Sequence, residues 1–220
     1  MDRRPTTTLS YAQSLDGRIA TALGDSQWIS GEETLRLAHE LRGSHDAILV
    51  GVGTILSDDP HLTCRLPGGR DPHRVVLDSR LRTPVESKVA RPAPTVRTTI
   101  FCANPTSEKR RAELETAGIA VVPVASDATG LDLRAVLDAL VDMGVASLLV
   151  EGGSGVVTSF FRAGLVDRLV LVSAPLVIGA GTDAVGDLGV RRLGEARRGR
   201  TTAVRQAGND VVWEMEFERG

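Results

Sequence analysis

A glutamate followed by a run of glycines is the feature of this 220-residue chain that is most suited to chemistry. Glu151 precedes Gly152-Gly153-Ser154-Gly155, directly after the apolar run Leu148-Leu149-Val150 and before apolar residues at helical spacing. A strand that leads through a glycine loop into a helix presents free backbone N–H groups, and these together with the helix dipole hold phosphates. An acid at the end of such a strand points into the crevice where α/β sheets bind ligands. The segment therefore predicts a ligand site that includes Glu151.

A second pair of glycines lies in Gly51-Val52-Gly53-Thr54, after another apolar run. Leu56 stands where a G-x-G-x-x-G sequence has its third glycine, so the match to a dinucleotide fingerprint is poor. The glycines still allow a ligand to approach the backbone closely. A plain tight turn is the alternative, because glycine is common in turns.

Acids and a helical arginine form a third group of candidates. Asp58-Asp59-Pro60 is typical of a turn and also supplies two carboxylates, whereas a metal site lacks further oxygen ligands at regular spacing. Arg42 shares helical spacing with Leu35 and Ala38, which predicts an inward-facing arginine that can meet a buried anion or extend back to solvent. The histidines form no ligand pair or triad and are interpreted as structural or surface residues: His39, His45, His61 and His73.

Strand and helix patterns alternate along most of the chain. Seven apolar runs, most without polar alternation, are predicted as strands covered on both faces: residues 6–11, 46–50, 74–78, 99–103, 119–124, 147–150 and 168–173. A capping box of Ser30 and Glu33 predicts a helix over 32–42 that Gly43 ends. Asp132 begins another predicted helix, which ends at Gly144.

The C-terminal segment predicts an antiparallel hairpin. Residues 202–206 and 211–218 flank the turn pair Gly208-Asn209. Trp213, Met215 and Phe217 alternate with glutamates, which predicts one buried and one solvated face. Together with the preceding alternation, the hairpin predicts a three-layer α/β/α fold with a mixed, mostly parallel sheet, in a single domain over residues 1–220.

Composition and charge exclude several classes of protein. The chain is 42% hydrophobic and 25% charged, with a formal net charge of −2, so it offers no bulk attraction to nucleic acid. No apolar stretch reaches the roughly 18 residues of a membrane span, and the N-terminus lacks an export signal. Cys64 and Cys102 are too few for a disulfide framework or a zinc site. We therefore expect a cytoplasmic protein without a metal.

A series of motifs follows in order along the chain: Ala12-Gln-Ser-Leu-Asp-Gly-Arg-Ile-Ala20, Ser26-Gln-Trp28-Ile-Ser30, Leu41-Arg42, Val50-Gly-Val-Gly-Thr54, Asp58-Asp-Pro-His-Leu-Thr63, Arg65, Val76-Leu-Asp78-Ser79 and Glu151-Gly-Gly153. In this order they resemble the pyrimidine reductases of riboflavin biosynthesis, whose fold is like that of dihydrofolate reductase. The resemblance runs from about residue 6 to residue 181. Each motif is weak alone, and their shared order is specific.

The resemblance implies NADPH-dependent reduction of a ribosylaminopyrimidine 5′-phosphate, whose cyclic ribosyl group becomes an open ribityl chain. It implies cofactor contacts at Ala12, Trp28, Thr54, Asp58, Ser79, Gly153, Ser154, Gly155, Val156, Val157, Thr158 and Ser159. It implies substrate contacts at Ser26, Arg42, Leu62, Arg65 and Glu151, with both arginines beside the phosphate. Asp58 and Glu151 are the candidate catalytic residues, and a homodimer is implied.

Two departures from the bifunctional relatives refine this expectation. The H-x-E and P-C-x-x-C sequences of a zinc deaminase are absent, so a reductase without a deaminase domain is implied. Ser10 replaces a lysine of those relatives, and the residues from Ser10 to Asp16 are more similar to stand-alone reductases. The substrate ring, diamino or amino-oxo, is therefore left open.

Ser79-Arg80 after a predicted strand favours NADPH over NADH, because a 2′-phosphate needs donors and positive charge. Asp78 is interpreted as a turn former, although it could serve as the acid of an NAD site, and Ser79-Arg80 could simply close the strand. Two other functions stay open. One is a reductase of another pterin, folate or specialised-metabolite pyrimidine, and the other is a non-catalytic nucleotide-binding protein.

Overall fold

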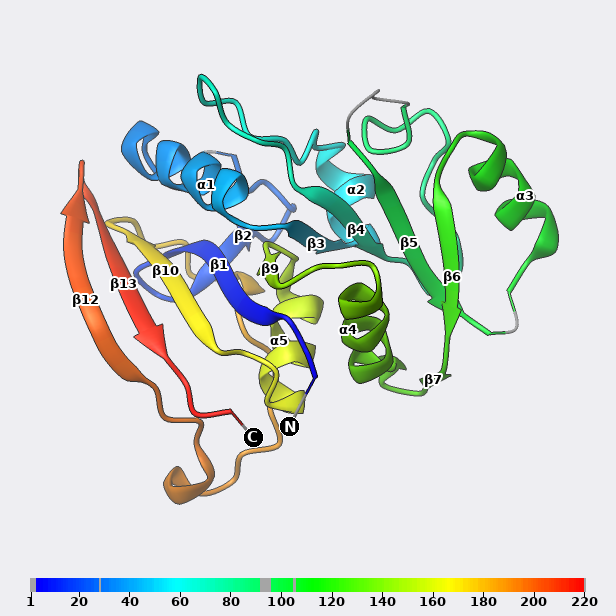
Figure 1. Cartoon of the computed structure of the whole chain (residues 1–220). Helices are drawn as coiled ribbons and strands as arrows, with labels where there is room; N and C mark the ends of the chain where they lie inside the picture. Colours follow the sequence, from blue (N-terminus) through cyan, green and yellow to red (C-terminus); the bar gives the residue numbers. More distant parts are fainter. Residues whose placement is uncertain (1–2, 28, 92–95, 105, 220) are drawn as a thin grey trace. The chain divides into compact units, whose positions relative to one another are not determined.

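The chain divides into two units (Figure 1). The computed structural model describes residues 3–27, 29–91, 96–104 and 106–219. Unit 1 comprises residues 1–6 and 40–149, and unit 2 comprises residues 7–39 and 150–220. That residues 1–220 form one domain stays a prediction.

Buried aliphatic strands form the centre of unit 1. Their order is β9 (Ser147–Val150), β3 (Ala47–Gly51), β4 (His73–Leu77), β5 (Thr98–Ala103) and β6 (Ala120–Val124). The pairs β3–β4, β4–β5 and β5–β6 are parallel. Residues 47 to 50 are all fully buried, as expected for a strand covered on both faces. The apolar runs of the sequence therefore predicted these strands correctly.

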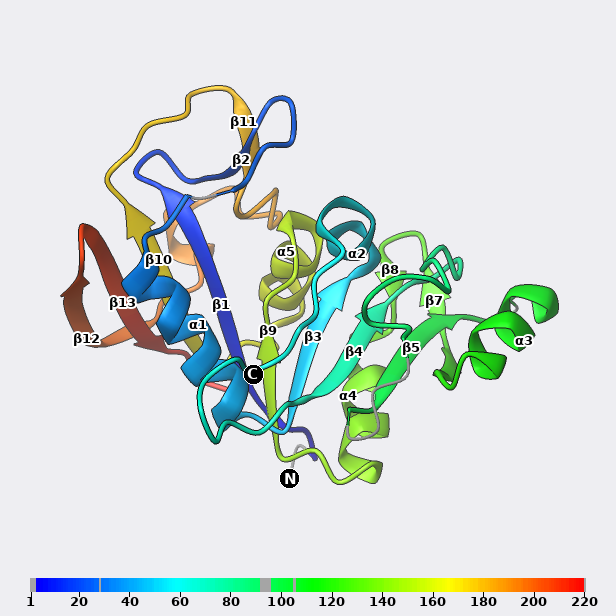
Figure 2. The ribbon, with the colours of Figure 1, turned by 90° about the horizontal axis from the view of Figure 1, so that it is seen from above.

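Helices cover both faces of this sheet. Ile55 of α2 (Val52–Asp58) and Leu114 of α3 (Glu108–Thr116) join one core cluster with strand residues such as Ile48. Helix α4 (Leu133–Asp142) lies on the opposite face from α2 (Figures 1 and 2). The short strands β7 (Ser126–Asp127) and β8 (Gly130–Leu131) precede α4. The predicted three-layer arrangement is confirmed.

The ends of α4 are as predicted from the sequence. The Asp132 carboxylate accepts hydrogen bonds from the backbone N–H groups of Arg134 and Ala135. Gly144, just beyond the helix, adopts φ +86°, a left-handed conformation that glycine adopts at low cost. Local sequence signals therefore define this helix.

Unit 2 contains the antiparallel part of the fold. Its strand order is β12 (Arg200–Ala207), β13 (Asp210–Glu216), β10 (Arg168–Ala174) and β1 (Thr6–Ser14). Strands β12–β13 and β13–β10 are antiparallel, whereas β10 and β1 are parallel. The predicted mixed sheet with a C-terminal hairpin is thus confirmed. The unit also holds α5 (Ser154–Ala163), β2 (Arg18–Thr21), β11 (Gly181–Asp183), η1 (Leu193–Glu195) and most of α1 (Glu32–Ser44).

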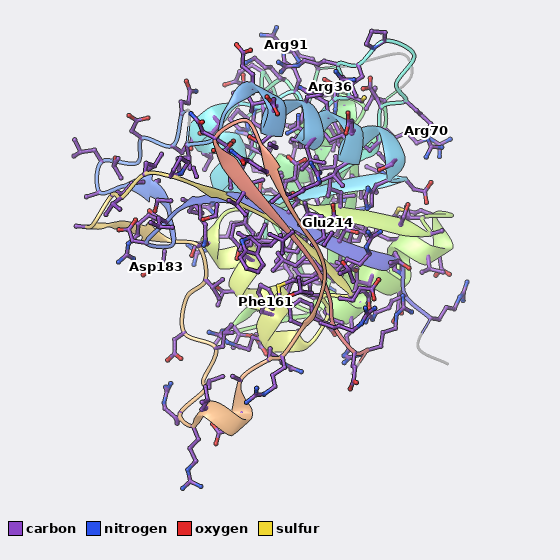
Figure 3. All side chains as sticks on the ribbon, turned by 90° about the vertical axis from the view of Figure 1, so that its left-hand side faces the viewer. Arg36, Arg70, Arg91, Phe161, Asp183 and Glu214 are labelled. Atoms are coloured by element: carbon purple, nitrogen blue, oxygen red, sulfur yellow. The ribbon has the colours of Figure 1, made fainter. Side chains whose placement is uncertain are left out.

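The predicted faces of the hairpin are wrong at Val212 and Trp213 and hold further along, where Met215 and Phe217 are half-buried and Glu216 and Glu218 are exposed. Val212 is completely buried although it shares a face with the glutamates, whereas Trp213 is 39% exposed. The Phe217 ring packs edge-on against Phe161 of α5, with 5.7 Å between ring centroids, and Figure 3 shows Phe161 beside the hairpin. Alternation reports burial only when one face is solvated, and here other elements cover part of each face.

Helix α1 also differs from its prediction. The Gly31 carbonyl accepts the Leu35 N–H at 3.1 Å, so Gly31 rather than Ser30 occupies the cap position, and the helix continues through Gly43. Leu35 is 36% exposed, while Thr34 is buried. The buried face of α1 is therefore rotated from the predicted face. Arg42 is half-buried at the edge of the buried face.

Asp210 explains where α1 begins. Its Oδ2 accepts hydrogen bonds from the Gly31 N–H at 2.8 Å and the Thr34 hydroxyl at 2.7 Å, and the residue is 4% exposed. We expect Asp210→Ala to lower the free energy of unfolding by about 1–3 kcal/mol, because the Gly31 N–H loses its acceptor and the Thr34 hydroxyl is left with the Gly31 carbonyl alone. Urea denaturation measures this loss. Asp127→Ala, which removes an exposed carboxylate, should cost about 0.5 kcal/mol or less, and an equal loss in both variants would contradict the assignment.

Candidate functional site

Two residues implied to bind the cofactor lie at one edge of the sheet in unit 1. Strands β3 and β4 are parallel, with Gly51 opposite Leu77, so the residues that follow these strands emerge side by side. Thr54 lies in the first turn of α2, and Ser79 follows β4 after one residue. The segment 51–54 is a passage from strand to helix, so the tight-turn alternative is wrong.

The turn after β4 is held from inside the protein. Asp78 is completely buried, and its Oδ2 accepts hydrogen bonds from the Thr83 N–H at 2.7 Å and the Thr83 hydroxyl at 2.8 Å. Asp78 is therefore the turn former that the sequence predicted. Arg110 of α3 donates to the carbonyls of Leu81 (3.1 Å) and Thr83 (2.8 Å). Sequence reasoning missed Arg110, because nothing local connects it with a turn 27 residues away.

Two residues of the same turn, Ser79 and Arg80, stay accessible to solvent. Ser79 is half-buried and Arg80 is exposed. The Ser79 carbonyl accepts the Ala103 N–H at 3.2 Å, which ties the turn to the end of β5. A hydroxyl and a guanidinium are therefore presented on a turn whose backbone is fixed on both sides.

The adjacent aspartates have different environments. Asp58, the last residue of α2, is exposed and accepts a hydrogen bond from the Ser57 hydroxyl at 2.6 Å. Asp59 caps the helix in a left-handed conformation, with φ 40°. Its carboxylate accepts the Lys88 N–H at 2.8 Å and lies 3.8 Å from the Lys88 ammonium. The turn-forming role therefore belongs to Asp59, and the Asp58 carboxylate faces outward.

One loop brings the two candidate phosphate arginines into the same region. The carbonyl of Thr63 accepts a hydrogen bond from Arg42 Nη1 at 3.5 Å, and Arg65 is exposed two residues further along. Two guanidinium groups in one region suit a dianionic phosphate, because each can donate two parallel hydrogen bonds. Leu62 is 2% exposed, has φ 52° and packs in the core cluster, so its backbone rather than its side chain is presented to a ligand.

The glycine loop of unit 2 has the geometry of a phosphate site. Gly153 caps α5 with an extended backbone and without a side-chain hydrogen bond, so the first N–H groups of the helix keep their donor capacity. A Cβ at Gly152 would lie 2.6 Å from the Val156 Cβ, and only glycine fits there. Glu151, directly before this loop, is half-buried. These residues fit the pyrophosphate of a dinucleotide.

Not every residue of the predicted cofactor stretch faces outward. Val157 is 1% exposed and Thr158 is 8% exposed. The Thr158 hydroxyl donates to the Ser154 carbonyl at 2.6 Å and accepts the Gly186 N–H at 2.8 Å. The side chains of these two residues therefore stabilise the helix and its neighbouring loop. Ala12 in β1 and Ser26 are half-buried in the same unit, and Trp28 lies outside the described residues.

Asp16 organises the loop that follows Ala12. Its carboxylate accepts hydrogen bonds from the Ser14 hydroxyl (2.6 Å) and from the N–H groups of Ile178 (3.1 Å) and Gly179 (2.7 Å). These bonds, the one from Ser14 first, lower the pKa of Asp16 to about 2. The motif that carried the family resemblance therefore includes a residue that joins two loops of unit 2.

A pocket of about 480 Å³ in unit 2 contains none of the predicted site residues. It is lined by Phe161 and Phe217 and by Arg197 and Arg198, which belong to a basic surface segment.

In the described part of the chain, no three His, Cys, Asp or Glu side chains are grouped so that they could hold a metal ion. No described helix is both long enough and apolar enough to span a membrane.

Comparison with known proteins identifies relatives over nearly the whole chain. The profile of the RibD C-terminal domain matches residues 5–213. A 2,5-diamino-6-ribosylamino-4(3H)-pyrimidinone 5′-phosphate reductase of Methanothermobacter thermautotrophicus is 40% identical over 218 residues, which cover 96% of this chain and 97% of that protein. The riboflavin biosynthesis protein RibD of Aquifex aeolicus is 39% identical over 213 residues, 95% of this chain and 57% of that protein.

Solved structures agree with these matches. A deaminase/5-amino-6-(5-phosphoribosylamino)uracil reductase of Thermotoga maritima has a TM-score of 0.79 at 29% identity, over 98% of this chain and 57% of that one. A dihydrofolate reductase of Enterococcus faecalis has a TM-score of 0.52 at 14% identity, over 97% and 96% of the two chains, and shows the fold alone. The chain thus spans little more than half the length of the RibD proteins that it matches.

Proposed function

The chain belongs to the RibD C-terminal domain family, and on that premise we propose that it reduces a ribosylaminopyrimidine 5′-phosphate to the ribitylamino form with NADPH. The observation that carries this proposal is the loop of unit 1 that follows the outward carboxylate of Asp58. The same loop holds Arg65 and accepts the hydrogen bond from Arg42. An acid and two guanidinium groups are what a phosphorylated, cation-forming substrate requires.

Each unit, taken by itself, contains residues that we propose to contact NADPH. In unit 2, the N–H groups at the start of α5 suit the pyrophosphate, with Gly153, Ser154 and Gly155 as the contacts and Ala12 in β1 as a further one; the Val156 N–H donates to the Gly153 carbonyl at 3.0 Å, so Val156 is proposed only as a neighbouring contact. In unit 1, the contacts are Thr54, Asp58 and Ser79. When bound, NADPH supplies the hydride that reduces the sugar C1′.

The residues of the protein align the substrate and stabilise its charged form. The ribosylamine opens to an imine at C1′, and protonation of its nitrogen gives an iminium that accepts hydride more readily. The negative charge of Asp58 favours this iminium. Glu151 accepts hydrogen bonds from the pyrimidine, Ser26 and the Leu62 backbone add contacts, and Arg42 and Arg65 hold the 5′-phosphate.

Three further features belong to the proposal. The match to nearly the full length of a reductase named for the diamino compound supports the diamino ring as substrate. A homodimer is proposed from the resemblance, and a cytoplasmic site of action suits a biosynthetic reductase. An alternative reductase of folates is disfavoured because a substrate without phosphate has no use for an arginine on this loop and a second arginine, Arg42 of α1, bonded to it.

The test is a direct assay of the purified protein. NADPH oxidation is followed by absorbance with the diamino and the amino-oxo ribosylaminopyrimidine phosphates side by side, and with dihydrofolate as a third substrate. We expect oxidation with the diamino compound and none with dihydrofolate. A folded protein that oxidises NADPH with neither pyrimidine would contradict the proposal.

The turn after β4 predicts the choice of coenzyme. Because Asp78 is buried and bonded to Thr83, the accessible groups directly after it are the Ser79 hydroxyl and the Arg80 guanidinium, which suit a 2′-phosphate. We expect kcat/KM with NADPH to exceed that with NADH by about tenfold or more, the effect of one charge-assisted contact. Replacing Ser79→Asp together with Arg80→Ala should erode the preference, mainly through KM for NADPH. Arg82→Ala is the control, because Arg82 is an exposed arginine of the same turn. Equal kcat/KM of the wild type with NADPH and NADH would contradict the proposed role of Ser79 and Arg80.

A further inference from the structure

Arg74 of β4 is an enclosed cation, and two of its three guanidinium nitrogens lack a hydrogen-bond partner in the described part of the chain. The residue is 3% exposed, and its Nε and Nη1 are buried without a partner in the described part of the chain. Burial lowers the pKa of Arg74, yet an arginine stays charged at neutral pH. Asp71 is a nearby acid whose negative charge stabilises the Arg74 cation in part, but no hydrogen bond joins it to the guanidinium Nε or Nη1, and its Oδ1 accepts the Cys64 N–H at 2.8 Å. Buried charges are retained at a cost to stability, so this one calls for a counterion.

The side chain of Arg74 lies on the face of β4 that packs into the same core cluster as Leu62 of the loop 59–65. Arg74 and Val76 are two residues apart in the strand and therefore share a face. Val76 belongs to the core cluster that includes Leu62 of this loop. Arg74 therefore projects on the side of the sheet whose core includes Leu62, a residue of the loop that also carries Arg65.

Cations accumulate around this loop. Partial burial and then three nearby positive charges hold the pKa of His61 below its ordinary value; the charges are those of Lys88, Arg65 and Arg74. Lys88 is paired with Asp59 at 3.8 Å. Arg74 therefore contributes a charge to the loop that no hydrogen bond at Nε or Nη1 offsets.

We propose that Arg74 is a positioning residue for a phosphate dianion, whose charge it attracts from beneath the loop that carries Arg65. The inference rests on the proposed function, since this phosphate is the 5′-phosphate of the proposed substrate. It adds a third arginine to the two that the family resemblance implies. Without phosphate, the enclosed charge destabilises unit 1, and phosphate binding offsets that charge.

The test uses the whole chain and inorganic phosphate as the probe. Thermal unfolding is measured against phosphate concentration for the wild type, Arg74→Met, Arg74→Lys and Arg91→Met. Met matches the length of an arginine stem without its charge, and Arg91 is an exposed arginine of the same unit, visible at the surface in Figure 3. We expect Arg74→Met to weaken phosphate affinity about tenfold, as for the loss of one close charge interaction, and to unfold no earlier than the wild type in phosphate-free buffer.

Two further readouts separate positioning from packing. Arg74→Lys keeps a basic group, and where the pH keeps that enclosed lysine protonated it should keep phosphate affinity within about threefold, a shift under 1 kcal/mol at 1.4 kcal/mol per factor of ten. With the phosphorylated pyrimidine, Arg74→Met should raise KM and leave kcat within about twofold, whereas Arg91→Met should change neither. Unchanged phosphate affinity in Arg74→Met would overturn the inference, as would phosphate binding too weak to measure in the wild type.

Should Arg74→Met fail to fold, Arg74→Lys decides the question, because lost phosphate affinity in a folded lysine variant, at a pH that keeps the lysine protonated, would equally overturn the inference. The result is independent of the reaction assay. Phosphate affinity that depends on Arg74, in a protein that reduces neither pyrimidine, would reject the proposed function and retain the anion site.

Discussion

Replacing Arg65 by alanine is expected to raise KM for the phosphorylated pyrimidine by about ten- to a hundredfold, while KM for NADPH changes little. Arg65 is exposed on the loop of unit 1 to which Arg42 donates a hydrogen bond. A charge-assisted contact to a phosphate contributes about 1.5–3 kcal/mol, and each 1.4 kcal/mol is a factor of ten in binding. Steady-state kinetics with each substrate varied in turn measures the effect.

A dephosphorylated substrate provides the decisive comparison for Arg65→Ala. It should be used equally poorly by the wild type and the variant, because the contact that the mutation removes is already missing. Arg70→Ala is a matched control, since Arg70 lies in the same connection but pairs with Asp46 at 2.9 Å. A rise in KM for NADPH with an unchanged KM for the pyrimidine would show that Arg65 serves the cofactor instead.

The second large effect is expected at Asp58. Asp58→Asn is nearly isosteric, and the exposed side chain bonds the neighbouring Ser57 hydroxyl, so the variant should fold normally. If the carboxylate favours the substrate iminium, kcat should fall by about tenfold or more, because one preorganised charge commonly contributes at least this much. Single-turnover measurements with saturating NADPH and substrate separate this step from product release.

Asp59→Asn is the control that the structure offers for Asp58→Asn. Asp59 has the same chemistry one residue later, but its carboxylate is bonded to the backbone and ammonium of Lys88. Its substitution should lower stability and affect kcat much less than the change at Asp58. A folded Asp58→Asn variant with wild-type kcat would contradict the catalytic role and leave Asp58 with only a structural role as the last residue of α2.

Several parts of the fold could be predicted because their signals are local. Residues 47 to 50 form a buried strand, as their unbroken apolar run indicates. The Asp132 cap and the left-handed Gly144 mark the ends of α4, and Gly208 turns the hairpin with φ 60°. Each of these features depends on the conformational preferences of a few consecutive residues. The order of the motifs likewise carried the family, since it is a property of the chain alone.

Other features were decided by segments distant in the sequence. Asp58 and Asp59 are adjacent and chemically identical. The backbone N–H of Lys88, 29 residues beyond Asp59, donates a hydrogen bond to the Asp59 carboxylate. Asp210 sets the start of α1 from 179 residues away, where the sequence favoured Ser30. The hydrogen-bond partner of each aspartate depends on which distant segment packs beside it. The conformational preferences of neighbouring residues carry no information about that packing.

Burial patterns were misread for the same reason. Val212 is enclosed and Trp213 is partly exposed, although side-chain polarity along the hairpin predicted a buried tryptophan face. In β4, Arg74 occupies the first position of a predicted apolar strand, and its polarity alone would place it in water. The sequence by itself determined the strands, the turns and the family. Tertiary structure decided which charges face solvent, because an electrostatic environment is the sum of the segments packed around a group.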